Sequence, residues 1–495
     1  MTGNRTAKPW RIVGVTGVGV ITAAGGFGLA YGLYSRSFLS WSGVTAFAVP
    51  VLVGVMIVAL FALITLALVR NTRVFGGVLA GFLGLSLGFM GGVVGPGIIG
   101  EQPIWTKPPE SALYDLEVEM ADIPASIIAQ VNNPLEGSRS THSYVAPLSD
   151  GGFIMVSSAG SRIFNFSQRG DERGFTTQAI ITRWSADLEV LDSLNLTEQF
   201  EDLNLVRGIV YNEATQKIHF SVTPVKKECL GLELWEMTLT VDPVTVSNPR
   251  MLFESSPCLD YTSGPQQFGG RVASDPDGTV YMTVGDFAFG FSTIREERLE
   301  GEYDGPPDEL VAPNNLGTVI AVSPNGDVEI LTRGHRNAQG LTFDPVSGKL
   351  WQSEHGPKGG DELNLIEPGN HHGWPDVTYG GPYGGVGQPD PNWELGRWYG
   401  QNHGDYTEPV FAWTPSIAPS QLLVYRGEDF PAWYGDILVA SFKGAIHRLR
   451  MVDGQVMIDE PIAIGERPRD LIEMPDGTLL IATDDDQVMR ISSKK

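Results

Sequence analysis

The sequence predicts an all-β domain, a six-bladed β-propeller, preceded by three transmembrane helices. Two observations lead to this prediction. The first hundred residues hold three long apolar stretches without a charged residue. From about Ser140 onward, an apolar strand, a turn rich in Asp, Asn and Gly, and a second apolar strand recur along the chain. Recurrence of one supersecondary unit indicates a repeat architecture, and four-stranded units of this kind close radially into a propeller.

The three apolar stretches are residues 12–34, 43–69 and 74–99. Each is longer than the roughly 20 residues that a helix needs to cross the hydrocarbon of a bilayer. A cleavable signal peptide is the alternative for the first stretch, but it leaves the two following spans unexplained. The stretches therefore predict a membrane module over residues 1–100.

Basic residues flank these spans unevenly, with only Arg36 between the first and second spans. The others lie before the first span and between the second and third: Arg5, Lys8, Arg11, Arg70 and Arg73. The positive-inside rule then places the N-terminus in the cytoplasm. We expect a multi-pass protein of the cytoplasmic (inner) membrane, with an extracytoplasmic C-terminal domain.

Residues 101–139 contain several prolines and predict a connector, with one short helix after Asp122. The propeller is expected over residues 140–495. Five hairpin units begin there at Val145, Gly208, Arg271, Gly340 and Asp470, and a sixth, with a longer turn, begins at Leu422. A β-sandwich is the alternative, but its strands would not recur so regularly.

The formal net charge of −24 argues against a nucleic-acid partner, because binding phosphates needs a basic face. An acidic surface is compatible with a neutral ligand such as a sugar, or reflects solubility alone. Cys229 and Cys258 are the two cysteines. They could form a disulfide in an extracytoplasmic domain, although nothing in their spacing requires it.

Loops from successive blades of a propeller meet at one central mouth. Residues beside the strand ends of the units should therefore gather there: Asp286, Arg336, Asn337, Lys443, Arg467 and Arg469. Three arginines and a lysine at one mouth of an acidic protein predict an anionic partner, because arginine pairs with carboxylates in two-pronged contacts. Surface ion pairs are the alternative interpretation.

Several motifs of the second half resemble the glucose/sorbosone dehydrogenase family. They are RNAQG at 336–340, SEHGPKGGDELNLI at 353–366, HGWP at 372–375, and the stretches 408–444 and 465–485. The family comprises soluble-type aldose sugar dehydrogenases that use pyrroloquinoline quinone on a six-bladed propeller. The resemblance covers roughly residues 140–495, and the first hundred residues have no counterpart in the soluble members.

This resemblance implies roles for individual residues. It assigns contacts with the quinone to Asn337, Lys443, Arg467 and Arg469, and it places Arg336 near the reactive quinone carbonyls. The backbone carbonyls of Gly356 and Pro357 match the ligands of a calcium ion that also binds the quinone. Calcium takes oxygen ligands, and as a Lewis acid it would polarise the carbonyl that accepts hydride.

Gln267 departs from the family pattern. It stands four residues before Arg271, where the family has the histidine that serves as general base. An amide cannot accept a proton near neutral pH. Asp286 matches the aspartate that orients this histidine. Left without that partner, it could itself act as the base or bridge through a water molecule. An early glutamine of the family, which also touches the quinone, has no counterpart in residues 203–208.

Two hypotheses follow. The first is a membrane-anchored quinoprotein that oxidises an aldose at the anomeric carbon to a lactone and passes electrons to the quinone pool or to a soluble carrier. The second is a non-catalytic propeller that binds a carbohydrate, a quinone or a protein partner. Gln267 favours the second hypothesis, and the intact motifs on the cofactor side favour the first.

Two further features have open interpretations. His371 and His372 are candidates for a metal site, although adjacent side chains on a strand point to opposite faces. The aromatic and glycine-rich residues 379–406 form a long loop. This loop could stack on a sugar, cover the edge of the propeller or contact a partner.

Overall fold

The computed structural model describes ten stretches of the chain. They are residues 116–131, 141–159, 178–200, 203, 205–224, 231–256, 267–287, 315–375, 377–381 and 404–494. The three expected membrane spans, the two cysteines and most of the loop at 379–406 lie outside them. Within the ten stretches, no helix is long and apolar enough to cross a membrane. The chain divides into two compact units, Met1–Ile104 and Trp105–Lys495.

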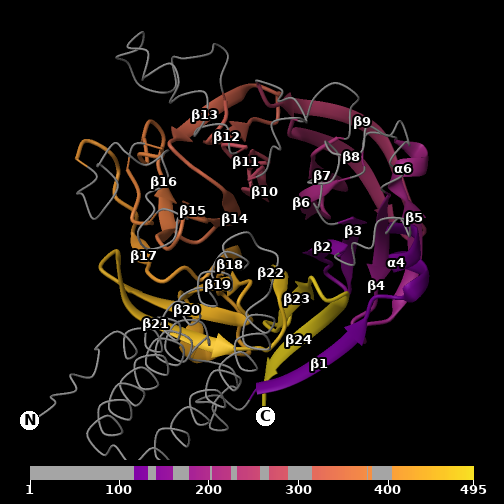
Figure 1. Ribbon diagram of the computed structural model, residues 1–495. Helices are drawn as coiled ribbons and strands as arrows, with labels where there is room; N and C mark the ends of the chain where they lie inside the picture. The colour runs from indigo at the N-terminus through magenta and orange to yellow at the C-terminus, as the bar shows by residue number, and fades with distance from the viewer. Residues whose placement is uncertain are drawn as a thin grey trace, which may run out of the picture. The chain divides into compact units, whose positions relative to one another are not determined.

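The second unit contains six four-stranded antiparallel sheets, which confirms the predicted propeller (Figure 1). The first sheet is β2 (Thr141–Pro147), β3 (Phe153–Ala159), β4 (Ala179–Trp184) and β5 (Val190–Asn195). The second is β6 (Val206–Asn212), β7 (Lys217–Val222), β8 (Glu233–Val241) and β9 (Val244–Glu254). The third is β10 (Gly269–Ser274), β11 (Val280–Val284), β12 (Thr318–Val322) and β13 (Val328–Arg333).

The remaining sheets continue around the ring. The fourth is β14 (Ala338–Asp344), β15 (Lys349–Glu354), β16 (Asp361–Ile366) and β17 (Phe411–Trp413). The fifth is β18 (Pro419–Val424), β19 (Ile437–Ser441), β20 (Ala445–Val452) and β21 (Gln455–Ala463). The sixth is β22 (Pro468–Glu473), β23 (Leu479–Thr483), β24 (Gln487–Ser493) and β1 (Leu116–Asp122). Each of the six predicted hairpin units forms the first two strands of one sheet.

Strand β1 comes from the stretch expected as a connector. It pairs antiparallel with β24, from Leu116 opposite Ser493 to Asp122 opposite Gln487. The sixth sheet therefore combines one strand from before the first sheet with three from the end of the chain, which closes the ring. The expected short helix follows as α4 (Ala125–Val131), whose Ile127 and Val131 are buried. The other described helices are the single turns α6 (Leu196–Gln199) and η6 (Pro431–Trp433).

Apolar residues on both faces of the sheets hold neighbouring blades together. All five residues of β12, Thr-Val-Ile-Ala-Val, are buried, as are those of β19 and β23. β-branched residues fill such doubly covered strands well because their side chains pack on the pleated surface. One core cluster lies between the first and second sheets, and another joins the first sheet to α4 and the sixth. Burial thus stabilises the contacts between blades as well as each blade.

The first strand of each sheet is its inner strand. Each inner strand contacts the inner strands of the two neighbouring sheets around the centre of the ring. Arg271 on β10 crosses this centre and is only 3% exposed. Its guanidinium donates to Asp470 Oδ1 on β22 at 2.7 Å and to the backbone carbonyls of Gln339, Ser420 and Arg469 at 2.9–3.2 Å. Asp470 also accepts the backbone N–H of Val145 on β2 at 2.8 Å. One buried ion pair therefore links five of the six blades.

Candidate active site

The predicted site residues lie at one end of the propeller, where the first strand of each sheet begins and the second ends. The register shows this directly: Ala338 on β14 faces Glu354 on β15, and Pro468 on β22 faces Thr483 on β23. Arg336 and Asn337 therefore precede β14 at the same end at which Gly356 and Pro357 follow β15. In the same way, Asp286 follows β11, Lys443 follows β19, and Arg467 and Arg469 lie at the start of β22.

Gln267, Asp286 and Arg336 are in direct contact. With its amide oriented to satisfy its neighbours, Gln267 donates to Asp286 Oδ1 and accepts from an Arg336 Nη, both at 2.9 Å. The backbone N–H of Asp286 donates to the carbonyl of Arg336 at 2.8 Å. Gln267 has a positive φ of 67° and packs so tightly on Gly285 that a Cβ at 285 would collide with its carbonyl. The three residues named as catalytic candidates thus form one cluster.

Trp374, from the HGWP motif, completes this cluster. Its indole Nε1 donates to Asp286 Oδ2 at 2.8 Å, and its ring lies 5.4 Å from the guanidinium carbon of Arg336. The carboxylate of Asp286 is 4% exposed and has a donor on each oxygen. Asp286 was expected to lack a partner in the absence of the family histidine. Instead, the amide of Gln267 donates a hydrogen bond to Asp286, as the histidine of the family would do.

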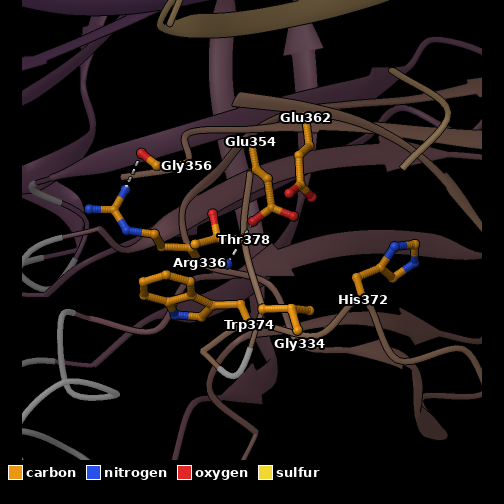
Figure 2. A pocket seen from close by; sticks show the side chains of 9 residues that line it. Gly334, Arg336, Glu354, Gly356, Glu362, His372, Trp374 and Thr378 are labelled. Carbon is orange, nitrogen blue, oxygen red and sulfur yellow. Dashed lines mark hydrogen bonds between the residues drawn. The ribbon is translucent and has the colours of Figure 1, made fainter. Parts of the chain in front are cut away.

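Arg336 also fixes the loop that follows β15. One Nη donates to the carbonyls of both His355 and Gly356 at 2.9 Å, as Figure 2 shows for Gly356. Its backbone N–H donates to Glu354 Oε2 at 2.6 Å. The carbonyl of Gly356, expected to bind calcium, therefore already accepts one hydrogen bond. Pro357 is buried against Gly380.

Two buried carboxyl groups lie behind Arg336. Glu354 and Glu362 are opposite each other on β15 and β16, and Asn364 donates to Glu354 at 3.0 Å. His335 Nδ1 lies 2.9 Å from the same Glu354 oxygen. Burial, and secondarily the negative charge of Glu354, raises the pKa of Glu362 well above its usual range. Both groups line a small cavity with Gly334, Arg336, His372, Trp374 and Thr378 (Figure 2).

The cofactor candidates from the last two sheets form a second cluster. Arg467 and Arg469 both donate to Asp484, at distances of 2.6–2.7 Å. Their guanidinium carbons lie 4.0 and 4.4 Å from the centre of the Phe442 ring. The side chain of Arg467 is 49% exposed, whereas that of Arg469 is 8% exposed. Two guanidinium groups share one carboxylate, so this carboxylate neutralises only half of their charge.

Lys443 and Asn337 have neutral partners. The Lys443 ammonium donates to the backbone carbonyl of Ser416 at 2.5 Å, and Asn337 Oδ1 accepts from Gln339 at 2.8 Å. His371 and His372 do not converge: the first ring packs on Tyr406, centroid to centroid 4.9 Å, and the second on His335 at 4.7 Å. In the stretches that the structure describes, no three His, Cys, Asp or Glu residues are arranged to hold a metal ion.

The sequence model of the Glucose / Sorbosone dehydrogenase family matches residues 208–490, more than half of the chain. The chain belongs to this family. The match begins within the second sheet and ends in β24, so it includes every predicted site residue.

Relatives of this glucose/sorbosone dehydrogenase family protein include named enzymes. It is 29% identical over 261 residues to the aldose sugar dehydrogenase YliI of Escherichia coli, covering 52% of this chain and 67% of that one. It is 30% identical over 280 residues to the quinoprotein glucose dehydrogenase B of Acinetobacter calcoaceticus, covering 44% and 58%. The chain spans between 57% and 67% of the length of the curated relatives that it matches.

Solved structures support the fold of this family member. The apo-form of the soluble aldose sugar dehydrogenase of E. coli superposes with a TM-score of 0.56 at 22% identity, over 76% of this chain and all of that one. A glucose dehydrogenase crystal structure superposes with a TM-score of 0.55, also at 22% identity, over 74% of this chain and 99% of that one. These similarities show that the propeller is shared.

Three residues of the mouth were not nominated from the sequence: Trp374, His142 and Arg207. Trp374 lies inside a motif that carried the resemblance, so its position was a usable signal. His142 and Arg207 start the first strands of the first two sheets, before or at the edge of the stretch that matches the family. The signal that could have found them is their position at the start of the first strand of a sheet, because the first strands of the other sheets also begin at this mouth.

Proposed function

We propose that this protein is a quinoprotein that oxidises an aldose at its anomeric carbon to a lactone, with pyrroloquinoline quinone and calcium as cofactors. The contact of Gln267, Asp286 and Arg336 at the same mouth as Arg467 and Arg469 carries the proposal. A cluster around the carboxylate of Asp286 and a cationic cluster thus lie at one end of the propeller, in a chain that belongs to the family. The names of the two curated enzymes agree with it.

The cationic cluster fits an anionic, flat cofactor. Pyrroloquinoline quinone carries three carboxylates on a planar ring system. Arg467, Arg469 and Lys443 supply N–H donors from two adjacent sheets, and among the described residues a single carboxylate, that of Asp484, pairs with the two guanidinium groups. Charge-assisted pairs of arginine with carboxylate are short and strong. We assign these three residues to the carboxylates of the cofactor and Asn337 to a neutral contact beside them.

The carbonyls of Gly356 and Pro357 are the proposed calcium ligands. A carbonyl oxygen has two lone pairs, so the Gly356 oxygen that accepts from Arg336 retains one for a cation. Calcium takes main-chain oxygens readily. When bound, the quinone and calcium together supply the acceptor for the hydride that leaves the anomeric carbon.

The protein itself must then accept the proton of the anomeric hydroxyl. Gln267 cannot do so, and Asp286 is the carboxylate that it contacts. In the proposed reaction, the C–H bond breaks with its electron pair leaving as hydride, the hydroxyl proton passes to Asp286, and a C=O bond forms. Each oxygen of Asp286 already accepts a hydrogen bond, from Gln267 or from Trp374, and these donors compete with the incoming proton. We therefore expect slow turnover.

A quinone- or sugar-binding propeller without turnover is the second candidate. The observation in its favour is that Gln267 occupies the place of the general base and uses both ends of its amide to bridge Asp286 and Arg336. Both candidates require the cofactor or the sugar to bind, but only the first requires the sugar to reduce the cofactor.

One spectral experiment tests the proposal. The purified full chain is mixed with pyrroloquinoline quinone and calcium, and then desalted. We expect retained quinone absorbance that aldoses bleach slowly.

Arg467→Ala should lose on the order of 1.5–3 kcal/mol of quinone binding, the range for hydrogen bonds to charged groups. Thermal melting of the variant controls for loss of fold. Unchanged quinone affinity in Arg467→Ala would refute the assignment of the cationic cluster.

We also propose that the propeller faces the extracytoplasmic side of the inner membrane, where it would bind a sugar and pass electrons to the quinone pool or a soluble carrier. The support is the placement of basic residues around three uncharged stretches. A C-terminal alkaline phosphatase fusion should be active, and a C-terminal green fluorescent protein fusion exported by the general route should be dark. The reverse pattern would exclude this topology.

A further inference from the structure

His142 and Arg207 are two buried side chains at the mouth that the proposed reaction does not use. His142 is the second residue of β2, and Arg207 is the second residue of β6, the neighbouring inner strand that packs against β2. Each residue is 7% exposed. Nδ1 of His142 and one Nη of Arg207 have no hydrogen-bond partner among the residues that the structure describes.

The contacts of His142 show which of its nitrogens carries the proton. An Nη of Arg469 lies 3.0 Å from Nε2 of His142, and a guanidinium can only donate. Nε2 is therefore the acceptor. Burial, and secondarily the charge of Arg469, lowers the pKa of His142 well below its usual range, so the ring is neutral. Its single proton must lie on Nδ1, which makes Nδ1 a buried donor.

Arg207 is a buried cation without a carboxylate partner among the described residues. Its Nε donates to the hydroxyl of Thr223 at 3.1 Å, and its guanidinium carbon lies 5.1 Å from the centre of the Phe268 ring. Gly270 leaves room for it, since a Cβ there would collide with the Cβ of Arg207. Burial lowers the pKa of Arg207 to about 10, still well above neutral pH, so the group stays charged.

The two buried aspartates of the sixth sheet pair with other arginines. Asp484 is held by Arg467 and Arg469, and Asp470 is held by Arg271. A buried charge without a counter-ion destabilises a folded protein, and a buried donor without an acceptor adds to that cost. Two such donors on adjacent inner strands, next to Arg469, complement a ligand that brings negative charge and acceptor oxygens.

We propose that His142 and Arg207 bind a carboxylate at the mouth, on the first and second sheets beside Arg469. Two ligands can supply it: the cofactor, through a carboxylate not held by Arg467 and Arg469, or an acidic sugar such as a uronate. The anion site itself stands on the two buried donors, and the identity of its ligand rests on the proposed function. A uronate would extend the substrate class from neutral to acidic aldoses.

The test compares Arg207→Met with a control in the same blade. Arg250→Met removes the same charge from β9, where the side chain of Arg250 is 47% exposed and pairs with Glu236. The full-length wild type and both variants are titrated with pyrroloquinoline quinone, with glucuronate and with glucose. Glucuronate and glucose differ only by a carboxylate in place of a hydroxymethyl group, so they isolate the charge. We expect Arg207→Met to lose at least tenfold in affinity for either the quinone or glucuronate, and Arg250→Met to lose neither.

Melting of the ligand-free proteins separates a binding role from a structural one. If Arg207 serves a ligand, Arg207→Met should melt no lower than wild type, because it removes an uncompensated buried charge. A lower melting temperature with unchanged affinities would overturn the proposal. His142→Phe replaces the imidazole by an apolar ring, so it removes the Nδ1 donor together with the Nε2 acceptor of Arg469, and it should weaken the same ligand as Arg207→Met. If His142→Phe weakened only a ligand whose affinity is unchanged in Arg207→Met, the two residues would not share one site.

These outcomes also distinguish this site from the proposed function. A wild type that binds glucuronate through Arg207 but does not bind quinone would support the anion site and refute the quinoprotein. A wild type that binds quinone, with an affinity unchanged in Arg207→Met and no preference for glucuronate over glucose, would support the quinoprotein and refute the anion site. Weaker quinone binding in Arg207→Met without that preference identifies the cofactor as the source of the carboxylate.

Discussion

Replacing Gln267 by histidine is expected to raise aldose oxidation by about 10²- to 10⁴-fold, the typical contribution of a positioned general base. Asp286 Oδ1 already accepts a hydrogen bond from residue 267, and it would accept one from the Nδ1–H group of the new ring. That contact would orient the imidazole and leave Nε2 for the sugar hydroxyl, with a pKa close to the operating range. The backbone suits the change, because histidine is enriched among non-glycine residues with positive φ. Activity is measured on quinone-loaded protein with an artificial dye acceptor.

A matched variant separates the new base from the loss of the glutamine contacts. Gln267→Met removes both hydrogen bonds, to Asp286 and to Arg336, and adds no base. It should therefore stay as slow as wild type or become slower. A Gln267→His variant that binds quinone normally yet remains inert with a broad panel of aldoses would argue for the binding propeller. Fast turnover by wild type itself would mean that Asp286 suffices as the base, and Asp286→Asn would then abolish it.

Arg271→Met is expected to destabilise the propeller by about 3–5 kcal/mol, the cost of removing one partner of a buried ion pair. The change leaves Asp470 buried without its cation and deprives three backbone carbonyls of a donor. Because these acceptors belong to different blades, the loss should weaken ring closure rather than one sheet. The midpoint of chemical denaturation, followed by near-ultraviolet circular dichroism, measures the effect.

Two comparisons test that explanation. Arg250→Met removes an arginine whose side chain is about half exposed, and it should cost no more than about 1 kcal/mol, as ion pairs at the surface do. Adding Asp470→Leu to Arg271→Met should recover part of the lost stability, because an apolar pair often replaces a buried ion pair at little cost. Equal denaturation midpoints for Arg271→Met and Arg250→Met would show that the central contact does not hold the ring together.

Much of the fold could be predicted because each blade is built from neighbours in sequence. A hairpin such as β22–β23 places Asp476 and Gly477 in its turn and apolar residues in both strands, so its pattern is local. Strand β1 was not predicted for the opposite reason. Its partner β24 lies at the far end of the chain, and its own sequence, LEVEMAD, is mostly exposed. Nothing in a local pattern indicates a pairing over that separation.

The candidate site, like the fold, has one part that local motifs predict and another that depends on contacts between blades. Motifs within single loops, such as RNAQG and HGWP, identified Arg336 and the loop that contains Trp374. The contact of Gln267 with Asp286 lies within the β10–β11 hairpin, whereas its contact with Arg336 exists only because the third and fourth blades are adjacent. From the sequence, Asp286 was expected to have lost its partner; in the structure the amide of Gln267 takes that place.

The sequence by itself determined the repeated hairpins, the family and the residues that meet at the mouth, because strand periodicity and loop motifs are properties of short segments. Only the tertiary structure decided which side chains are buried there with a partner and which are not. Arg469 has Asp484, Arg271 has Asp470, and Arg207 has no described carboxylate. The physical reason is that burial and charge compensation depend on every blade around the ring, and those neighbours are set only when β1 closes against β24.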